Sequence, residues 1–312
     1  MVCRRCFAVA CFVAMSSLTS STAHAQAREL GEPVEEEREP REHWRWQRFM
    51  PEEVIALVLG QATGHIVTFA QPDVGTRWRG PLPLDEEVRD VMRLRTPEAR
   101  RLAASVSDTV FFVMTAWPIA VDAFVLAGLV HQDWDAMAQM ALIDAEVLSI
   151  AYGISALTTR FVGRERPSAR ECNGDPNAER DCGDDGVGPH ASFVSGHTLV
   201  VLASAGLVCS HHLNNPWLTG SSEGATLMCG GSLALASTVA AYRLMTDLHW
   251  ASDVFAGAAI GGLLGFVLPW ALHYAHPIRR GGDRASVPPA FTFRVTPQVD
   301  ANEQSLFVSG TF

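Results

Sequence analysis

The stretch YRLMTDLHWASD, residues 242–253, holds an arginine, a histidine and an aspartate in the pattern R-x5-H-x3-D. If a helix begins near Ser252 or slightly earlier, His249 and Asp253 lie one turn apart. The carboxylate can then accept a hydrogen bond from one imidazole nitrogen and leave the other nitrogen free. This spacing makes His249 a candidate nucleophile.

Two further stretches have the same chemical character. GRERP, residues 163–167, ends an apolar run, and SFVSGHT, residues 192–198, begins another. In this order the three stretches resemble the signature of the type 2 phosphatidic acid phosphatase superfamily, which is K-x6-R-P, P-S-G-H and S-R-x5-H-x3-D. The superfamily also contains the vanadium haloperoxidases. The resemblance covers roughly residues 110–275, and three ordered motifs are a strong signal where one alone is weak.

The chain departs from this signature at three positions. Thr159 falls where the family has lysine, Val194 where it has proline and Tyr242 where it has serine. Because the chain contains no lysine, Arg160 is expected to replace the missing ammonium group, although arginine and lysine differ in reach and geometry.

The composition indicates a membrane protein and excludes a nucleic-acid partner. Hydrophobic residues make up 48% of the 312 residues, more than in a typical soluble enzyme. The formal net charge of -10 leaves no basic stripe that could neutralise the phosphates of a duplex.

The N-terminal region is predicted to be a signal followed by a polar linker. Residues 1–25 carry Arg4 and Arg5, then an apolar run, then small residues up to Ala25, which is the pattern of a secretory signal peptide. Cleavage near Ala25 is favoured, with an uncleaved anchor as the alternative. Residues 26–107 are predicted to hold the linker and interfacial or marginally spanning helices.

Within this region, two stretches leave alternatives open. HWRWQRF at 43–49 fits a membrane interface or an ordinary packed surface patch about equally well. Residues 54–70 are barely long enough to cross a bilayer and are predicted to be a marginal span.

The apolar runs predict an all-α, multi-span transmembrane helix bundle over residues 108–276. The runs cover about 109–131, 137–159, 196–211, 226–244 and 252–275. Alternating crossings place all three motifs at one end of the bundle. Asp122, Asp144 and Glu146 lie inside these runs and are expected to make structural hydrogen bonds. The tail, 277–312, alternates apolar and polar residues and predicts a small β-hairpin.

The cysteines bear on the compartment. Cys172 and Cys182 bracket a polar loop on the motif side, which predicts a disulfide and an oxidising compartment. Cys209 and Cys229 are expected to be buried free thiols. Together with His211 and His212 they lack the usual zinc spacing, so no metal site is expected there.

We therefore expect the bacterial inner membrane, with the active site facing the periplasm, as the family resemblance also implies. Two observations favour the cytoplasm instead: many arginines lie on the motif side, and residues 54–70 would reverse the orientation if they span.

The resemblance implies roles for the motif residues, with no metal and no cofactor. His249 would attack phosphorus, Asp253 would orient it, and His197 would protonate the leaving oxygen and later activate water. The phosphate oxygens would be bound by planar guanidinium groups and by donors at a helix N-terminus. These binding residues are Arg166, Arg243, Ser195, Gly196 and, in place of the lysine, Arg160.

These roles describe a metal-independent phosphatase that acts on a membrane lipid phosphate or an isoprenoid pyrophosphate through a phosphohistidine. One alternative is a vanadate-dependent haloperoxidase-like enzyme, against which the long apolar runs argue. A second is a membrane protein without catalytic activity that retains the pocket for binding. Thr159 in the lysine position supports the second alternative.

Overall fold

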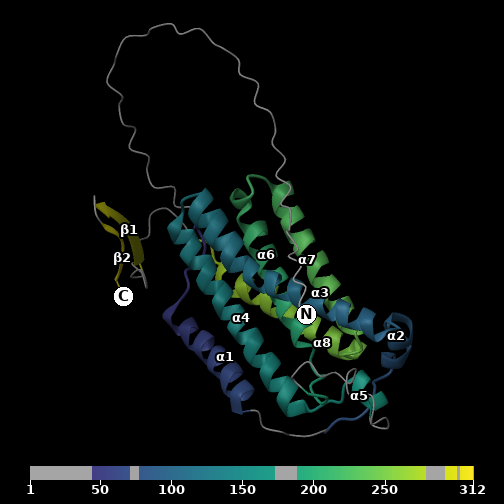
Figure 1. Cartoon of the computed structure of the whole chain (residues 1–312). Helices are drawn as coiled ribbons and strands as arrows, with labels where there is room; N and C mark the ends of the chain where they lie inside the picture. The colour runs from purple at the N-terminus through teal and green to yellow at the C-terminus, as the bar shows by residue number, and fades with distance from the viewer. Residues whose placement is uncertain (1–43, 71–76, 173–187, 279–291, 301–302, 312) are drawn as a thin grey trace, which may run out of the picture. The chain divides into compact units, whose positions relative to one another are not determined.

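The computed structural model describes residues 44–70, 77–172, 188–278, 292–300 and 303–311. Its helices are shown in Figure 1: α1 (Pro51–Ala70), α2 (Asp85–Met92), α3 (Pro97–Trp117), α4 (Trp134–Val162), α5 (Pro167–Cys172), α6 (Gly196–Asn214), α7 (Ser222–Met245) and α8 (Ala251–Gly262). Helix η1 (Pro118–Val130) continues α3, and η2 (Pro216–Leu218) follows α6. Helices η3 (Leu263–Val267) and η4 (Trp270–Tyr274) continue α8.

Five helical segments in the described ranges are long and apolar enough to cross a membrane: α1, α3 with η1, α4, α7, and α8 with η3 and η4. The prediction of a mostly helical fold with several helices long enough to span a membrane is therefore confirmed. Helix α6 lies at its centre, buried almost throughout from Thr198 to His212 and in contact with α3, α4, α7 and α8. A helix surrounded on all sides can carry polar residues that face partners rather than lipid.

Glycines bring α8 close to α6. Gly257, Gly261 and Gly265 recur every four residues and so lie on one face of the helix. A Cβ atom on Gly257 would come within 2.7 Å of the Ser195 carbonyl oxygen, and one on Gly261 within 2.2 Å of the Leu199 oxygen. Small residues allow such close packing between membrane helices, and here they hold the start of α8 against the start of α6.

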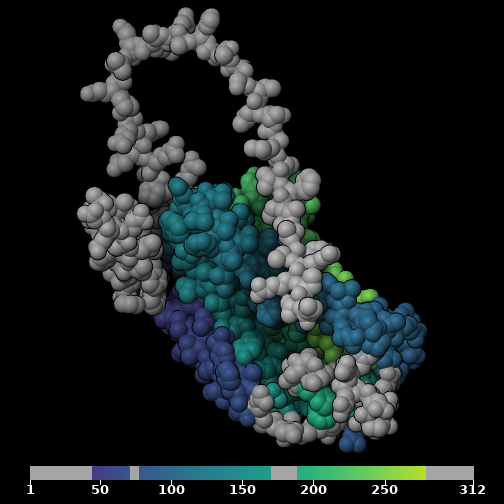
Figure 2. All heavy atoms as spheres, in the orientation of Figure 1, coloured from purple at the N-terminus to yellow at the C-terminus, as the bar shows by residue number. Residues whose placement is uncertain are grey.

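Helix α1 packs along α4 in the same way. A Cβ atom on Gly60 would lie 2.6 Å from the Ser149 backbone oxygen. In the space-filling view of Figure 2, α1 is the purple helix at the edge of the bundle, beside the teal α4. The stretch predicted as a marginal span is thus a 20-residue helix that qualifies as a membrane span by length and composition.

The segment that precedes α1 packs against the end of η4. Trp44, Trp46 and Phe49 are all buried, and Trp46 contacts the Tyr274 ring edge-on at 5.5 Å between ring centroids. The Trp46 indole N–H also donates to the Asn215 side chain at 3.0 Å. Of the two alternatives for residues 43–49, the packed patch describes this segment.

One prediction about the cysteines is wrong. Cys209 and Cys229 form a disulfide with a Cα–Cα distance of 4.3 Å and are not free thiols. The physical reason is the short connection between α6 and α7, which makes the helices antiparallel neighbours and places the two cysteines at similar heights on facing surfaces.

Three other predictions fall outside the described residues or are left open. The signal peptide and Cys182 lie outside the described ranges. The C-terminal tail contains strands β1 (Thr292–Asp300) and β2 (Glu303–Thr311), paired antiparallel. No side chain of the tail is described, so a stable appended hairpin stays a prediction.

Candidate active site

The three motifs lie where four helices end or begin. Helix α4 ends at Val162, just before Arg164 and Arg166, and α6 begins at Gly196. Arg243 lies in the last turn of α7, and α8 begins at Ala251, just after His249. We call this the motif end of the bundle and the opposite end the far end. The chain segment 77–93, with α2, also lies at the motif end (Figure 1).

His249 is buried, and its orientation is set by a backbone carbonyl. The Nδ1 atom lies 2.7 Å from the Ser192 carbonyl oxygen. Because a carbonyl only accepts, Nδ1 carries the proton and Nε2 presents a lone pair. The predicted direct bond to Asp253 is not formed, since His249 precedes the N-cap residue Trp250 and the helical one-turn spacing does not apply to it.

Asp253 instead caps α8 and fixes Ser192. Its carboxylate accepts from the Trp250 backbone N–H at 2.9 Å and from the Ser192 hydroxyl at 2.5 Å. Ser192 thus connects the two predicted partners, with its hydroxyl on Asp253 and its carbonyl on His249. The aspartate orients the histidine through this serine.

Arg164 is the cation that compensates Asp253. Its guanidinium is fully buried, 2.5 Å from Asp253 Oδ1 and 2.7 Å from Asp85 Oδ2. Asp85 also accepts from the backbone N–H and the hydroxyl of Ser252, each at 2.8 Å. Burial acts to raise the pKa of Asp85, but the hydrogen bonds from Ser252, Leu82 and Arg164 lower it below its ordinary value.

A second acidic residue anchors the loop between α7 and α8. The buried Asp247 carboxylate accepts from Arg89 Nε at 2.6 Å and lies 2.9 Å from Arg93 Nε. Both arginines belong to the segment around α2, which is remote in sequence from the motifs. This anchor lies two residues before His249 and restricts its position.

Two arginines predicted to bind phosphate are buried around His249. Arg166 and Arg243 are each 2% exposed, which is rare for arginine and indicates a polar interior. Burial lowers the pKa of His249 well below its ordinary value, and the positive charges of Arg166 and Arg243 lower it further. His249 is therefore neutral near pH 7.

His197 is the more accessible histidine. Its Nε2 atom lies 3.0 Å from Asp108 Oδ1, and the same oxygen accepts from Arg243 Nη1 at 3.0 Å. The Phe111 ring lies 4.4 Å from the imidazole ring, centroid to centroid. Asp108 and Phe111 come from α3, so this helix completes the site.

The start of α6 supplies the remaining predicted donors. Ser195 is the N-cap residue, fully buried, and its hydroxyl lies 2.9 Å from that of Thr198. A Cβ atom on Gly196 would come within 2.3 Å of the Ser155 hydroxyl oxygen, so this position admits only glycine without movement. The N-terminus of a helix favours an anion.

Arg160 occupies the last turn of α4 and is half-buried. Within the described ranges it makes no hydrogen bond or ion pair, whereas Arg164 is fully engaged with two aspartates. Of these two arginines, only Arg160 is available to a ligand. Its role in phosphate binding stays a prediction.

Sequence reasoning missed Asp108, Asp85, Asp247 and the structural role of Ser192. Asp247 lies inside the R-x5-H stretch and Ser192 opens the second motif, so both could have been suspected. Asp85 and Asp108 stand in segments without a motif, and nothing in their local sequence distinguishes them from other acidic residues.

Residues 141–277 match the family model of the PAP2 superfamily. A similar solved structure is the crystal structure of a transmembrane PAP2-type phosphatidylglycerolphosphate phosphatase from Bacillus subtilis. Sequence identity is 16% and the TM-score 0.44, over 70% of this chain and 94% of that chain. No curated protein sequence matches the chain. The matched residues 141–277 contain all three motifs, so the similarity to the PAP2 superfamily lies in the part of the chain that forms the candidate site.

Proposed function

We propose that this protein is a membrane-embedded phosphatase that hydrolyses a lipid phosphate or an isoprenoid pyrophosphate through a phosphohistidine on His249. The observation that carries the proposal is the state of this histidine. Its Nδ1–H donates to Ser192, its Nε2 keeps a lone pair, and buried positive charges surround it. A neutral imidazole beside two guanidinium groups is suited to attack a bound phosphate.

In the first step, Nε2 of His249 forms a bond to phosphorus while the bond from phosphorus to the leaving oxygen breaks. Arg166 and Arg243 hold the non-bridging oxygens, where charge accumulates in the transition state. The backbone N–H groups at the start of α6 add to this stabilisation. The leaving oxygen takes a proton from His197, which Asp108 holds at 3.0 Å.

In the second step, His197 accepts a proton from water, and the water oxygen attacks phosphorus. The P–N bond breaks, inorganic phosphate leaves and His249 returns to its neutral form. The guanidinium groups supply the electrostatic stabilisation throughout, so the proposed reaction requires no metal at the motif end.

The exposed members of the site indicate how a lipid reaches it. The side chains of Asp108 and His197 are 48% and 29% exposed, whereas those of Arg166, Ser195, Arg243 and His249 are buried. Next to them on α3, Phe112 presents an exposed apolar ring. A phosphate headgroup could enter beside α3 while its acyl or isoprenoid chain stays in the bilayer.

The direction of α1 relates the motif end of the bundle to the residues that precede this helix. Glu53, near its start, lies at the far end beside His273, and the chain after α1 reaches the motif end, where Arg77 donates to Gly163. If α1 crosses the membrane, the motif end and residue 50 lie on opposite sides. We retain the periplasmic active site as part of the proposal, and with α1 as a span, residue 50 would then lie in the cytoplasm.

The test is phosphate release from a short-chain phosphatidic acid by the full chain in detergent. Wild-type protein and the His276→Ala control should release phosphate, with and without EDTA, and His249→Ala should not. A radiolabelled substrate should leave acid-labile label on the wild type and on His276→Ala, but not on His249→Ala. Normal turnover of His249→Ala would refute the phosphohistidine, and oxidation of halide in the presence of vanadate and peroxide would favour the haloperoxidase alternative.

The pH dependence offers a separate check. Because the pKa of His249 lies well below 6.5, the free enzyme keeps an unprotonated nucleophile as the pH falls through 6.5. We expect no loss of kcat/KM from this group until well below that pH. A fall of kcat/KM in acid with an apparent pKa near 6.5, shifted in variants of Arg166, would contradict the lowered pKa of His249.

A further inference from the structure

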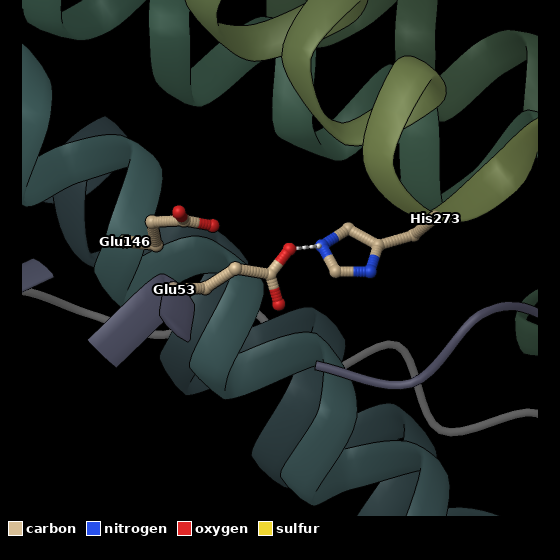
Figure 3. A group of neighbouring side chains, drawn as sticks. All are labelled: Glu53, Glu146 and His273. Carbon is tan, nitrogen blue, oxygen red and sulfur yellow. Dashed lines mark ion pairs between the residues drawn. The ribbon is translucent and has the colours of Figure 1, made fainter. Parts of the chain in front are cut away.

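A group of three potential metal ligands lies at the far end of the bundle, away from the phosphatase site. Glu53 belongs to the first turn of α1, Glu146 to α4 and His273 to η4. One ligand atom from each lies within 4.8 Å of the others, and Figure 3 shows the three side chains directed toward a common space. At 1.5 Å per residue along α8 to η4, this group is roughly 30 Å from His249.

His273 is held in the tautomer that a metal requires. The ring is fully buried and stacked with Phe49, and its Nδ1 lies 3.2 Å from the Gln47 carbonyl oxygen. Because that oxygen only accepts, Nδ1 carries the proton and Nε2 presents its lone pair to the cluster. Metal-binding histidines are commonly oriented by such a bond from the second ring nitrogen to a carbonyl.

The lone pair of His273 faces another acceptor. Glu53 Oε1 is 3.5 Å from Nε2, and Nε2 has no hydrogen-bond partner although it is buried. Two acceptors facing each other in a buried space repel unless a positive group lies between them. A bound cation or a shared proton would supply that group.

Glu146 adds a second carboxylate that lacks a counter-charge. It is 3% exposed and makes no hydrogen bond or ion pair with any residue in the described part of the chain. The other two acidic residues predicted to be structural differ from it: Asp144 is hydrogen-bonded to His211 at 2.6 Å, and Asp122 accepts from the Trp117 indole N–H at 3.1 Å. The prediction of structural hydrogen bonds thus holds for those two aspartates and fails for Glu146.

We propose that Glu53, Glu146 and His273 bind one divalent transition-metal ion of the Zn²⁺ or Mn²⁺ class. Two carboxylates and a neutral imidazole would neutralise a divalent ion, and mixed nitrogen and oxygen donors suit these metals. Ligand atoms around tetrahedral zinc lie about 3.4 Å apart, given bonds near 2.1 Å. The Glu53–His273 pair already has nearly this separation, and the Glu146 side chain would move inward to complete the site with a water.

The ion would join α1 and α4 to the end of η4, at the point where the N-terminal segment packs. It would stabilise the bundle and take no part in phosphate chemistry. Its test therefore needs no activity measurement, and its failure would leave the phosphatase proposal untouched.

The experiment is zinc retention by the full-length protein, purified in detergent through a tag without histidines. Protein stripped with EDTA is loaded with Zn²⁺, desalted and analysed for metal by mass spectrometry. We expect about one zinc per chain for the wild type, and at least a tenfold lower affinity for Glu146→Gln and His273→Gln, since each removes a ligand. Matched controls are the exposed neighbours, Glu52→Gln and His276→Gln, which should retain zinc.

The proposal would be overturned in favour of a shared proton by either of two results. One is equal zinc content in the wild type and both cluster variants, and the other is no retained zinc in the wild type. X-ray absorption on the zinc-loaded wild type covers the case in which the variants do not fold. One imidazole with oxygen ligands is expected, and sulfur or several imidazoles would also overturn the proposal. Zinc should raise the melting temperature of the wild type but not that of Glu146→Gln.

Discussion

Replacing Arg164 by methionine should destabilise the motif end more than the same replacement of an exposed arginine does. The Arg164 guanidinium is fully buried between Asp85 at 2.7 Å and Asp253 at 2.5 Å. Methionine fills a similar volume but leaves two buried carboxylates without their cation. Breaking a buried ion pair in this way costs about 3–5 kcal/mol. With about 2–4 °C per kcal/mol for a domain of this size, the melting temperature should fall by roughly 10 °C.

The pH dependence of this loss has a defined sign. Hydrogen bonds, including those from Arg164, hold the pKa of Asp85 below its ordinary value despite its burial. A carboxylate with a lowered folded-state pKa contributes stability above its unfolded pKa of about 4, and this contribution is lost as the pH falls through the folded value. The difference between wild type and Arg164→Met should therefore be largest near neutral pH and shrink in acid.

The assay is thermal unfolding of the full chain in one detergent over a pH series, followed by phosphate release from the surviving folded fraction. Arg95→Met is the matched control, because Arg95 is exposed and, among the described residues, donates only to the Asp90 backbone oxygen at 3.3 Å. Adding Asp85→Asn to Arg164→Met should recover part of the lost stability, since it removes one uncompensated charge. A melting temperature of Arg164→Met equal to that of the control would refute the argument.

Three further predictions concern individual motif residues. His197→Ala should slow alkyl phosphates far more than p-nitrophenyl phosphate, because a general acid matters most for a basic leaving oxygen; equal losses would argue against this role. Arg160→Ala should raise KM, and Thr159→Lys in that background should restore part of the affinity, while an unchanged KM would assign Arg160 to the membrane interface. Cys172 and Cys182 should resist maleimide in denatured, non-reduced protein and react after reduction; two thiols reactive without reductant would place the active site in the cytoplasm.

The helices and the placement of the motifs could be predicted because both depend on local patterns. Apolar runs long enough for a bilayer give helices, and polar residues at their ends mark the boundaries. Alternation of the crossings then determines which motifs share an end. The marginal run at 54–70 was harder, because its helix is stabilised by close packing of Gly60 and Gly64 on α4, a contact that its own sequence does not reveal.

The residues that hold His249 and Asp253 in place could not be predicted. Their contacts depend on where α8 starts and on segments that are remote in the sequence. His249 and Asp253 have the spacing of a helical pair, yet the helix begins between them and Asp253 turns to the N-cap. Its actual partners, Ser192 and Arg164, come from the other two motifs. Only the folded chain shows that the three motifs are joined by hydrogen bonds among themselves.

The same contacts extend the functional unit beyond the family match. Residues 141–277 contain all the motifs, but Arg164 needs Asp85 as its second counter-charge and Asp247 needs Arg89. His197 likewise pairs with Asp108 on α3. A buried charge whose partner is removed costs several kcal/mol, so a fragment that begins at residue 108 or 141 would leave Arg164 with one aspartate and Asp247 without Arg89. We therefore propose that the segment from residue 77 onward folds together with the candidate site, although no motif marks it.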